Sequence, residues 1–187
     1  MDLDERVLGW MLDVRTPWLT DVFLVVTNLG GTVASWAIAA AVTVALLVRR
    51  RPALAVMVSG AMLTGLLAMS GLKLVVGRAR PPFPERLVDE TTHSFPSGHA
   101  MMSAILVCVV AVVIVRVADR RWRTPWVFVL LAAWTLTIGL SRVYLAAHWL
   151  TDVLAGWALG ALWAALWAWG LVRFDRKPSG ATPSSLP

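Results

Sequence analysis

Five long runs of apolar residues dominate this chain and restrict what it can fold into. A helix that crosses a bilayer needs about 20 mostly apolar residues, and each run approaches that length. Because lipid offers no hydrogen bonds to free backbone groups, each run is expected to form a helix and pack in a bundle. The expected spans are Thr32–Val48, Ala53–Leu72, Ala100–Val117, Pro125–Tyr144 and Leu150–Val172. The expected fold class is therefore all-α, an integral-membrane helical bundle with five transmembrane helices.

The composition excludes other classes of protein. Of the 187 residues, 58% are hydrophobic and 15% are charged, whereas a soluble domain has about 45–50% and roughly 25%. The single Cys108 excludes a disulfide scaffold and a cysteine metal cluster. The formal charge is +6, but the basic residues stand in short clusters between apolar runs, so we expect no nucleic-acid partner. The 11 tryptophans suit a membrane protein with anchors at the interface.

The stretch Val7–Val26 is a sixth candidate crossing, which its polar residues argue against. Four residues interrupt it: Asp13, Arg15, Pro17 and Asp21. A charge at the centre of a membrane costs about 2.5–3.5 kcal/mol on insertion scales. We therefore expect residues 1–28 to form an interfacial segment, with Trp10 and Trp18 at the level of the headgroups.

Residues 1–177 are expected to form one membrane-embedded domain, followed by a Pro/Ser-rich tail over 178–187 that we expect to be disordered. Within the last span, Gly156 and Gly160 have the four-residue spacing that lets two helices pack closely. We interpret this pair as a helix contact within the chain. The sequence leaves the oligomeric state open.

Basic residues are divided unequally between the two sets of connecting segments. One set holds ten basic and two acidic residues: Arg49, Arg50, Arg51, Arg116, Arg120, Arg121, Arg123, Arg173, Arg176 and Lys177, with Asp119 and Asp175. The other set holds seven basic and nine acidic residues. Cytoplasmic loops carry the excess of Lys and Arg, so the first set is expected in the cytoplasm. Segments 73–99 and 142–149 are then expected outside it, at a cell (plasma or inner) membrane.

Three polar clusters are expected to meet at the outer side of the bundle. They are Lys73-x6-Arg80-Pro81, Pro96-Ser97-Gly98-His99 and Ser141-Arg142-x5-His148-x3-Asp152. Lys73, Arg80 and Arg142 would repel one another unless an anion with several oxygens held them together, and the arginine fork matches phosphate oxygens. Ser97 is a good N-cap for the following helix, whose free amides attract an anion. Gly98 allows close approach of the backbone.

His148 and Asp152 stand four residues apart and are expected to share one helix face. The carboxylate would fix the tautomer of His148 and leave its other ring nitrogen as a nucleophile. His99 would donate a proton to the leaving oxygen and afterwards activate water. These parts predict phosphoryl transfer through a covalent histidine intermediate. Three carboxylates lie in the same segment: Glu85, Asp89 and Glu90. Their spacing matches no standard Mg²⁺ cage, so we predict a metal-independent reaction without a cofactor.

Together, the three clusters resemble the signature of the type 2 phosphatidic acid phosphatase superfamily, which includes membrane lipid phosphatases, glucose-6-phosphatase and the vanadium haloperoxidases. The resemblance covers residues 73–152, and no motif position is substituted. It implies that His148 is the nucleophile, Asp152 its partner and His99 the general acid. It also implies five phosphate-binding residues: Lys73, Arg80, Ser97, Gly98 and Arg142. Membrane members commonly have six crossings, against the five expected here.

The resemblance implies an integral-membrane lipid phosphatase at the outer leaflet, with lipid phosphates and membrane lipids as partners. Candidate substrates are undecaprenyl or another polyprenyl (di)phosphate, phosphatidylglycerophosphate and phosphatidic acid. One alternative is a non-catalytic lipid-phosphate binder or translocator, which needs the three cations but no nucleophile. Another is a haloperoxidase, since the family site can hold vanadate. Outside the motifs, His93 is expected at a substrate entrance, and Arg78 and Arg86 in solvated loops or at lipid headgroups.

Overall fold

The computed structural model describes residues 2–175 of the chain, and the tail over 178–187 lies outside them. Within the described range the chain forms α-helices and one short 3-10 helix, and no strands. The elements are α1 (Leu3–Asp13), α2 (Pro17–Leu29), α3 (Thr32–Val48), α4 (Pro52–Val76), α5 (Gly98–Val117), η1 (Arg120–Trp122), α6 (Pro125–Tyr144) and α7 (Leu150–Asp175).

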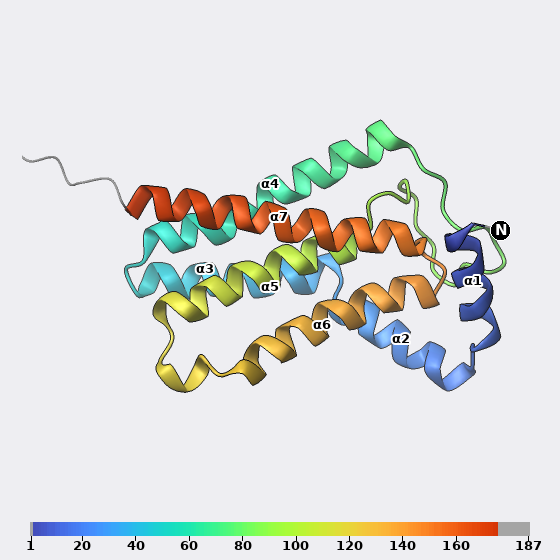
Figure 1. Ribbon diagram of the computed structural model, residues 1–187, viewed down its shortest axis with the longest axis horizontal. Coiled ribbons are helices and arrows are strands. Elements are labelled where there is room, and N and C mark those ends of the chain that lie inside the picture. The colour runs from blue at the N-terminus through green and yellow to red at the C-terminus, as the bar shows by residue number, and fades with distance from the viewer. Residues whose placement is uncertain (1, 176–187) are drawn as a thin grey trace, which may run out of the picture.

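The long helices lie side by side in an elongated bundle (Figure 1). Among the described residues, five segments are long and apolar enough to cross a membrane: Pro17–Val48, Pro52–Val76, Gly98–Val117, Pro125–Tyr144 and Leu150–Asp175. The prediction of an all-α bundle with five spans is confirmed. In the last four spans, the largest difference from the expected bounds is Leu72 against Val76, at the end of the second span.

The first span begins earlier than expected, at Pro17 instead of Thr32. Proline breaks the chain as expected, but it stands at the start of α2, where its missing N–H costs no helical hydrogen bond. Asp13 and Arg15 precede this helix, so that of the three charges only Asp21 lies within it. A glycine pair then separates α2 from α3. Residues 17–28, expected at the interface, thus belong to the first apolar span. For residues 1–16 the interfacial placement stays a prediction.

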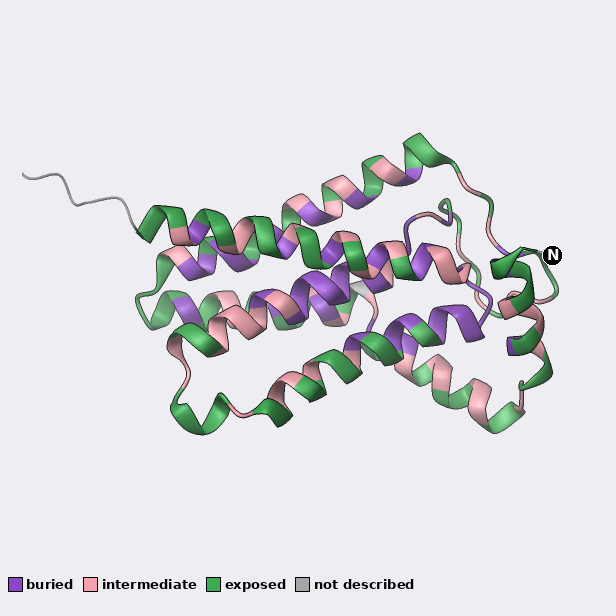
Figure 2. Cartoon of the chain, viewed as in Figure 1, coloured by how far each residue is buried: buried purple, intermediate pink, exposed green. Residues whose placement is uncertain are grey.

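Many large apolar side chains of the bundle are exposed, and Figure 2 shows exposed residues along the outer sides of the helices. Leu74, Val75 and Trp126 are among the most exposed of them. So large an exposed apolar surface is unusual for a soluble monomer and suits contact with lipid tails.

Helices α5 and α7 form the most extensive helix contact, and two glycines of α7 allow it. A Cβ atom at Gly156 would lie 2.9 Å from the carbonyl O of Ser97, and one at Gly160 would lie 2.5 Å from the carbonyl O of Met101. Neither position has room for a side chain, so the two backbones pack directly against each other. The predicted contact within the chain is confirmed.

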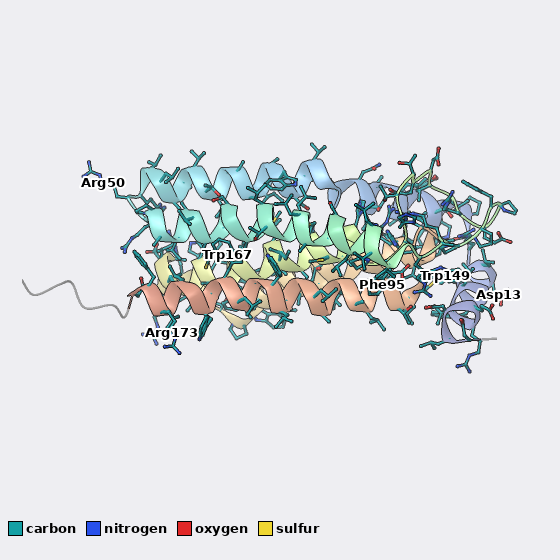
Figure 3. All side chains as sticks on the ribbon, turned by 90° about the horizontal axis from the view of Figure 1, so that it is seen from above. Asp13, Arg50, Phe95, Trp149, Trp167 and Arg173 are labelled. Atoms are coloured by element: carbon teal, nitrogen blue, oxygen red, sulfur yellow. The ribbon has the colours of Figure 1, made fainter. Side chains whose placement is uncertain are left out.

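One end of the bundle gathers the segments that contain the three polar clusters. Helices α4 and α6 end there, α5 and α7 begin there, and α1 lies across it (Figure 1). Figure 3 shows Phe95 and Trp149 at this end, and Arg50 and Arg173 at the opposite end. Gly77 ends α4 with a φ of 62°, a left-handed conformation that suits glycine, and turns the chain into the connection that leads to α5.

Candidate active site

The turn before α7 places His148 beside Asp152. Oδ2 of Asp152 accepts a hydrogen bond from the backbone N–H of Trp149 at 3.0 Å and so caps the start of the helix. The same oxygen lies 3.6 Å from Nδ1 of His148. The two side chains are 2% and 0% exposed. The predicted neighbours are therefore together, but 3.6 Å is longer than a direct hydrogen bond.

Ser94 bridges the two residues and was not predicted from the sequence. Its hydroxyl donates to Oδ2 of Asp152 and lies 3.3 Å from Nδ1 of His148. Ser94 is fully buried, and its own backbone N–H donates to the carbonyl O of Arg78 at 2.8 Å. A single serine in a connecting segment has no pattern that distinguishes it, so only the folded chain identifies this contact.

Arg80 contacts the other ring nitrogen of His148. Its Nη1 lies 3.2 Å from Nε2 and also donates to the carbonyl O of Ala147 at 2.7 Å. A guanidinium group can only donate, so Nε2 carries the lone pair. The proton of the neutral ring then stands on Nδ1, which faces Ser94 and Asp152.

Burial lowers the pKa of His148 to about 4. The nearby carboxylate of Asp152 opposes this shift, and the positive charges of Arg80, Arg142 and Lys73 add to it. The imidazole is therefore neutral at pH 7, with an unprotonated nitrogen directed toward the cations.

Ser97 and Gly98 stand at the start of α5, as predicted. Ser97 occupies the N-cap position, but its hydroxyl makes no capping bond, contrary to expectation. Instead, this oxygen is buried and has no hydrogen-bond partner among the described residues. A Cβ atom at Gly98 would meet only Met69, at 3.5 Å, which is an ordinary contact. The fold itself therefore does not require glycine at this position.

His99 lies on the first turn of α5 and faces the same cluster. It interacts electrostatically with His148, Arg80, Arg142 and Glu90. The two histidines singled out from the sequence thus belong to one site, although they come from different helix ends.

Lys73, Arg80 and Arg142 are near enough to repel one another, as predicted. An acidic residue of the chain relieves this repulsion, because Glu90 forms ion pairs with Arg142 and, at 3.8 Å, with Arg80. Burial opposes ionisation of Glu90, but these two arginines outweigh it and lower the pKa of the carboxyl below its usual value. Nε of Arg142 is buried without a hydrogen-bond partner among the described residues.

Arg78 lies behind Asp152, not in a solvated loop or at lipid headgroups as expected. Its Nη1 donates to Oδ1 of Asp152 and its Nη2 to Oδ2 of Asp4, both at 2.7 Å. Burial opposes the charged forms of Asp4 and Arg78, but their hydrogen bonds outweigh it, which lowers the pKa of Asp4 and raises that of Arg78. Asp4 also accepts the backbone N–H of Thr151 at 2.9 Å, so α1 is attached to the start of α7.

All the predicted site residues lie at this end of the bundle. Besides the contacts above, the backbone N–H of Ser97 donates to the carbonyl O of Asp152 at 3.0 Å and joins α5 to α7. The arrangement places an oriented, neutral imidazole beside three cations, an unpartnered hydroxyl and a helix N-terminus. Such a site is suited to nucleophilic attack on a group that carries several negatively charged oxygens.

The chain is similar in sequence and structure to known proteins. A family model described as the PAP2 superfamily matches residues 52–176. Phosphatidylglycerophosphatase B of Bacillus subtilis is 32% identical over 163 residues, which cover 85% of this chain and 78% of that protein. Undecaprenyl-diphosphatase of Sulfolobus acidocaldarius is 34% identical over 71 residues, which cover 38% of this chain and 30% of that protein. The crystal structure of a transmembrane PAP2 type phosphatidylglycerolphosphate phosphatase from Bacillus subtilis matches with a TM-score of 0.84 and 28% identity, covering 95% of this chain and 87% of that one.

Proposed function

This chain belongs to the PAP2 superfamily of phosphatases, and on that premise we propose that it hydrolyses lipid phosphate monoesters or diphosphates through a phosphohistidine intermediate on His148. The main support is the geometry of this residue. Its Nδ1 faces Ser94 and Asp152, whereas its Nε2 faces Arg80 and carries the lone pair. A histidine nucleophile needs such an unprotonated and directed nitrogen.

In the first step, Nε2 of His148 forms a bond to phosphorus while the bond from phosphorus to the leaving oxygen breaks. The ring becomes cationic, and the carboxylate of Asp152 stabilises it through the proton on Nδ1. His99 donates a proton to the leaving oxygen. The product leaves as an alcohol from a monoester, or as a monophosphate from a diphosphate.

In the second step, water attacks the phosphorus, and the bond from phosphorus to Nε2 breaks. His99, deprotonated by the first step, accepts a proton from this water. Cleavage of the bond to Nε2 releases phosphate and returns His148 to its neutral form. In both steps the non-bridging oxygens bind Lys73, Arg80 and Arg142. The hydroxyl of Ser97 donates to the same group.

Phosphatidylglycerophosphate is the first candidate substrate, because the Bacillus subtilis relatives that match most of this chain are named for that activity. A polyprenyl diphosphate is the second, because a shorter part of the chain matches an undecaprenyl-diphosphatase. Phosphatidic acid completes the set of candidates. The site lies at helix ends, so a lipid would present its phosphate there while its tails remain between the helices.

We place the site outside the cytoplasm, in the cell membrane. The opposite end of the bundle carries most of the basic connecting segments, among them Arg50 and Arg173 (Figure 3), and such segments usually remain cytoplasmic. Intact spheroplasts should therefore hydrolyse a membrane-impermeant substrate analogue. Hydrolysis by inverted vesicles alone would reverse the orientation.

The test of function is phosphate release from the candidate lipids by purified protein in detergent with EDTA. We expect the wild type to be active and His148→Ala to lose at least about a thousandfold in kcat, as for removal of a nucleophile. His93→Ala is the matched control, because the His93 side chain is exposed and only its carbonyl contacts the site. Wild-type turnover by His148→Ala would refute the intermediate. Binding of every lipid without phosphate release would instead support the binder or translocator.

A further inference from the structure

All three cations assigned to phosphate are already bound by oxygen atoms of one short segment, residues 90–93. The pairs are Lys73 Nζ with the carbonyl O of His93 at 2.5 Å, Arg80 Nε with the carbonyl O of Thr92 at 2.7 Å, and Arg142 Nη2 with Oε1 of Glu90. This segment presents to the cations a set of oxygens from several directions, as a phosphate group would.

Glu90 is the charged member of the segment, and a phosphate would have to replace it. The carboxylate is 29% exposed, whereas its partners Arg142 and Arg80 are only 2% and 5% exposed. Two buried guanidinium groups need an anion, because an unpaired buried charge is strongly destabilising. In the free protein, Glu90 supplies that anion.

The segment lies at the surface between two fixed points. Residues 91–93 are exposed. On one side, the backbone N–H of Leu87 donates to the carbonyl O of Leu145 at 3.0 Å. On the other side, the backbone N–H of Ser94 donates to the carbonyl O of Arg78 at 2.8 Å. A shift of the residues between these anchors would leave the buried contacts of Ser94 in place.

We propose that Glu90 is an internal competitor for the phosphate position: it pairs with Arg80 and Arg142 in the free protein, and the phosphate of the substrate displaces it. This role rests on the proposed function, which assigns these cations to phosphate. A phosphate dianion displaces a carboxylate because it carries more charge and more acceptor oxygens. After hydrolysis, the return of Glu90 to the arginines favours release of inorganic phosphate. Glu90 therefore sets both the affinity for phosphate groups and the rate of product release.

The test is binding of inorganic phosphate and of vanadate to the full-length protein in detergent. Binding is measured from the rise of the thermal unfolding midpoint with anion concentration and, separately, from competitive inhibition of turnover. Glu90→Gln keeps the shape of the side chain and removes its charge. We expect both dissociation constants to fall about five- to tenfold, as for loss of a partly exposed competing ion pair. The KM for a lipid monoester should fall in parallel.

Asp89→Asn is the matched control. It removes the same charge from the adjacent residue, which is exposed and makes no ion pair with the described residues. We expect its anion affinities to change less than about twofold, as for a screened surface charge. If Glu90→Gln is too unstable to assay, Glu90→Asp tests the same idea, because its shorter carboxylate should compete less and give an intermediate gain in affinity.

Weaker anion binding by Glu90→Gln would overturn the proposal, because it would mean that Glu90 holds the arginines in place for phosphate. An equal gain in Asp89→Asn would also overturn it, because the effect would then be one of net charge. The unfolding assay requires no turnover. Tighter anion binding by Glu90→Gln in a protein that hydrolyses no lipid phosphate would therefore refute the proposed function and leave the role of Glu90 supported.

Discussion

Ser94 donates a hydrogen bond to Asp152, 58 positions later in the chain. Because the hydroxyl proton is used on the carboxylate, Oγ of Ser94 can only accept from Nδ1 of His148, which lies 3.3 Å away. This pair of residues therefore fixes both the tautomer of the imidazole and the direction of its unprotonated nitrogen.

Ser94→Ala should lower kcat about ten- to hundredfold and leave KM nearly unchanged, because Ser94 orients the nucleophile and does not bind substrate. Steady-state kinetics on a lipid monoester measures both constants. Ser59→Ala is a suitable control, since its hydroxyl donates only to the carbonyl O of Ala55 within α4. A higher KM with unchanged kcat would contradict the orienting role.

The depressed pKa of His148 predicts an unusually acidic limit of activity. The imidazole becomes protonated only near pH 4, well below its ordinary value of 6.5, so kcat/KM should fall on the acid side near the lower value. A rate profile between pH 3.5 and 8 measures this limit. An acid limb near pH 6.5 would contradict the burial argument.

The same shift predicts a pH dependence of stability. Between the folded pKa of about 4 and the unfolded value of 6.5, the unfolded chain binds more protons at His148 than the folded protein does. The free energy of unfolding should therefore fall as the pH drops through this window. Thermal unfolding at pH 7 and pH 4.5 measures the fall, which His148→Gln should reduce. An equal fall in the variant would assign it to other groups.

Removal of Arg78 should change the pKa of His148 through Asp152. Without this cation on Oδ1 of Asp152, the carboxylate holds a proton on His148 more strongly, so Arg78→Ala should lower kcat and move the acid limb of the rate profile to higher pH. Arg78→Lys keeps the positive charge, so its kcat and its acid limb should lie between those of the wild type and Arg78→Ala.

Asp4→Asn separates this charge effect from attachment of the N-terminal helix. The variant loses the ion pair between α1 and Arg78 but keeps the cation beside Asp152. Its unfolding midpoint should therefore fall while the acid limb of activity stays in place. A shift of the acid limb to higher pH as large as that of Arg78→Ala would show that Arg78 acts only through the packing of α1.

Two glycines should respond differently to substitution. Gly160→Ala should destabilise the protein by about 1–3 kcal/mol, as overpacking does, because the new Cβ would lie 2.5 Å from the carbonyl O of Met101. Gly98→Ala should leave the unfolding midpoint unchanged, because its Cβ makes only an ordinary contact with Met69. It should lower affinity for phosphate and vanadate if the anion approaches the backbone closely at this position. Full activity of Gly98→Ala would contradict a close approach of phosphate there.

Features that depend on short stretches of sequence, such as the spans and the motifs, were predictable. The spans depend on the length of apolar runs, which decides whether a helix can cross lipid. The three motifs follow the same topology, since helix direction alone brings Lys73, His99 and His148 to one end of the bundle. The first span starts earlier than its sequence predicts, because Pro17 and Asp13 do not interrupt a helix: they stand at and before the start of α2.

Pairs between distant residues were not predictable. Asp4 and Arg78 are 74 positions apart, and nothing in either local pattern indicates the other. The sequence indicates no partner for Glu90, because Arg142, with which it forms an ion pair, lies 52 positions away. Such contacts depend on how the connecting segments pack against the helix ends. Hydrophobic periodicity does not determine that packing.

The phosphohistidine intermediate is tested most directly by rapid quenching of the protein during turnover of a lipid phosphate, at alkaline pH, followed by peptide mapping in a mass spectrometer. We predict a phosphoryl group on His148 in the wild type and none in His148→Ala. A phosphoryl group on a different residue, or undiminished phosphate release by His148→Ala, would contradict the mechanism.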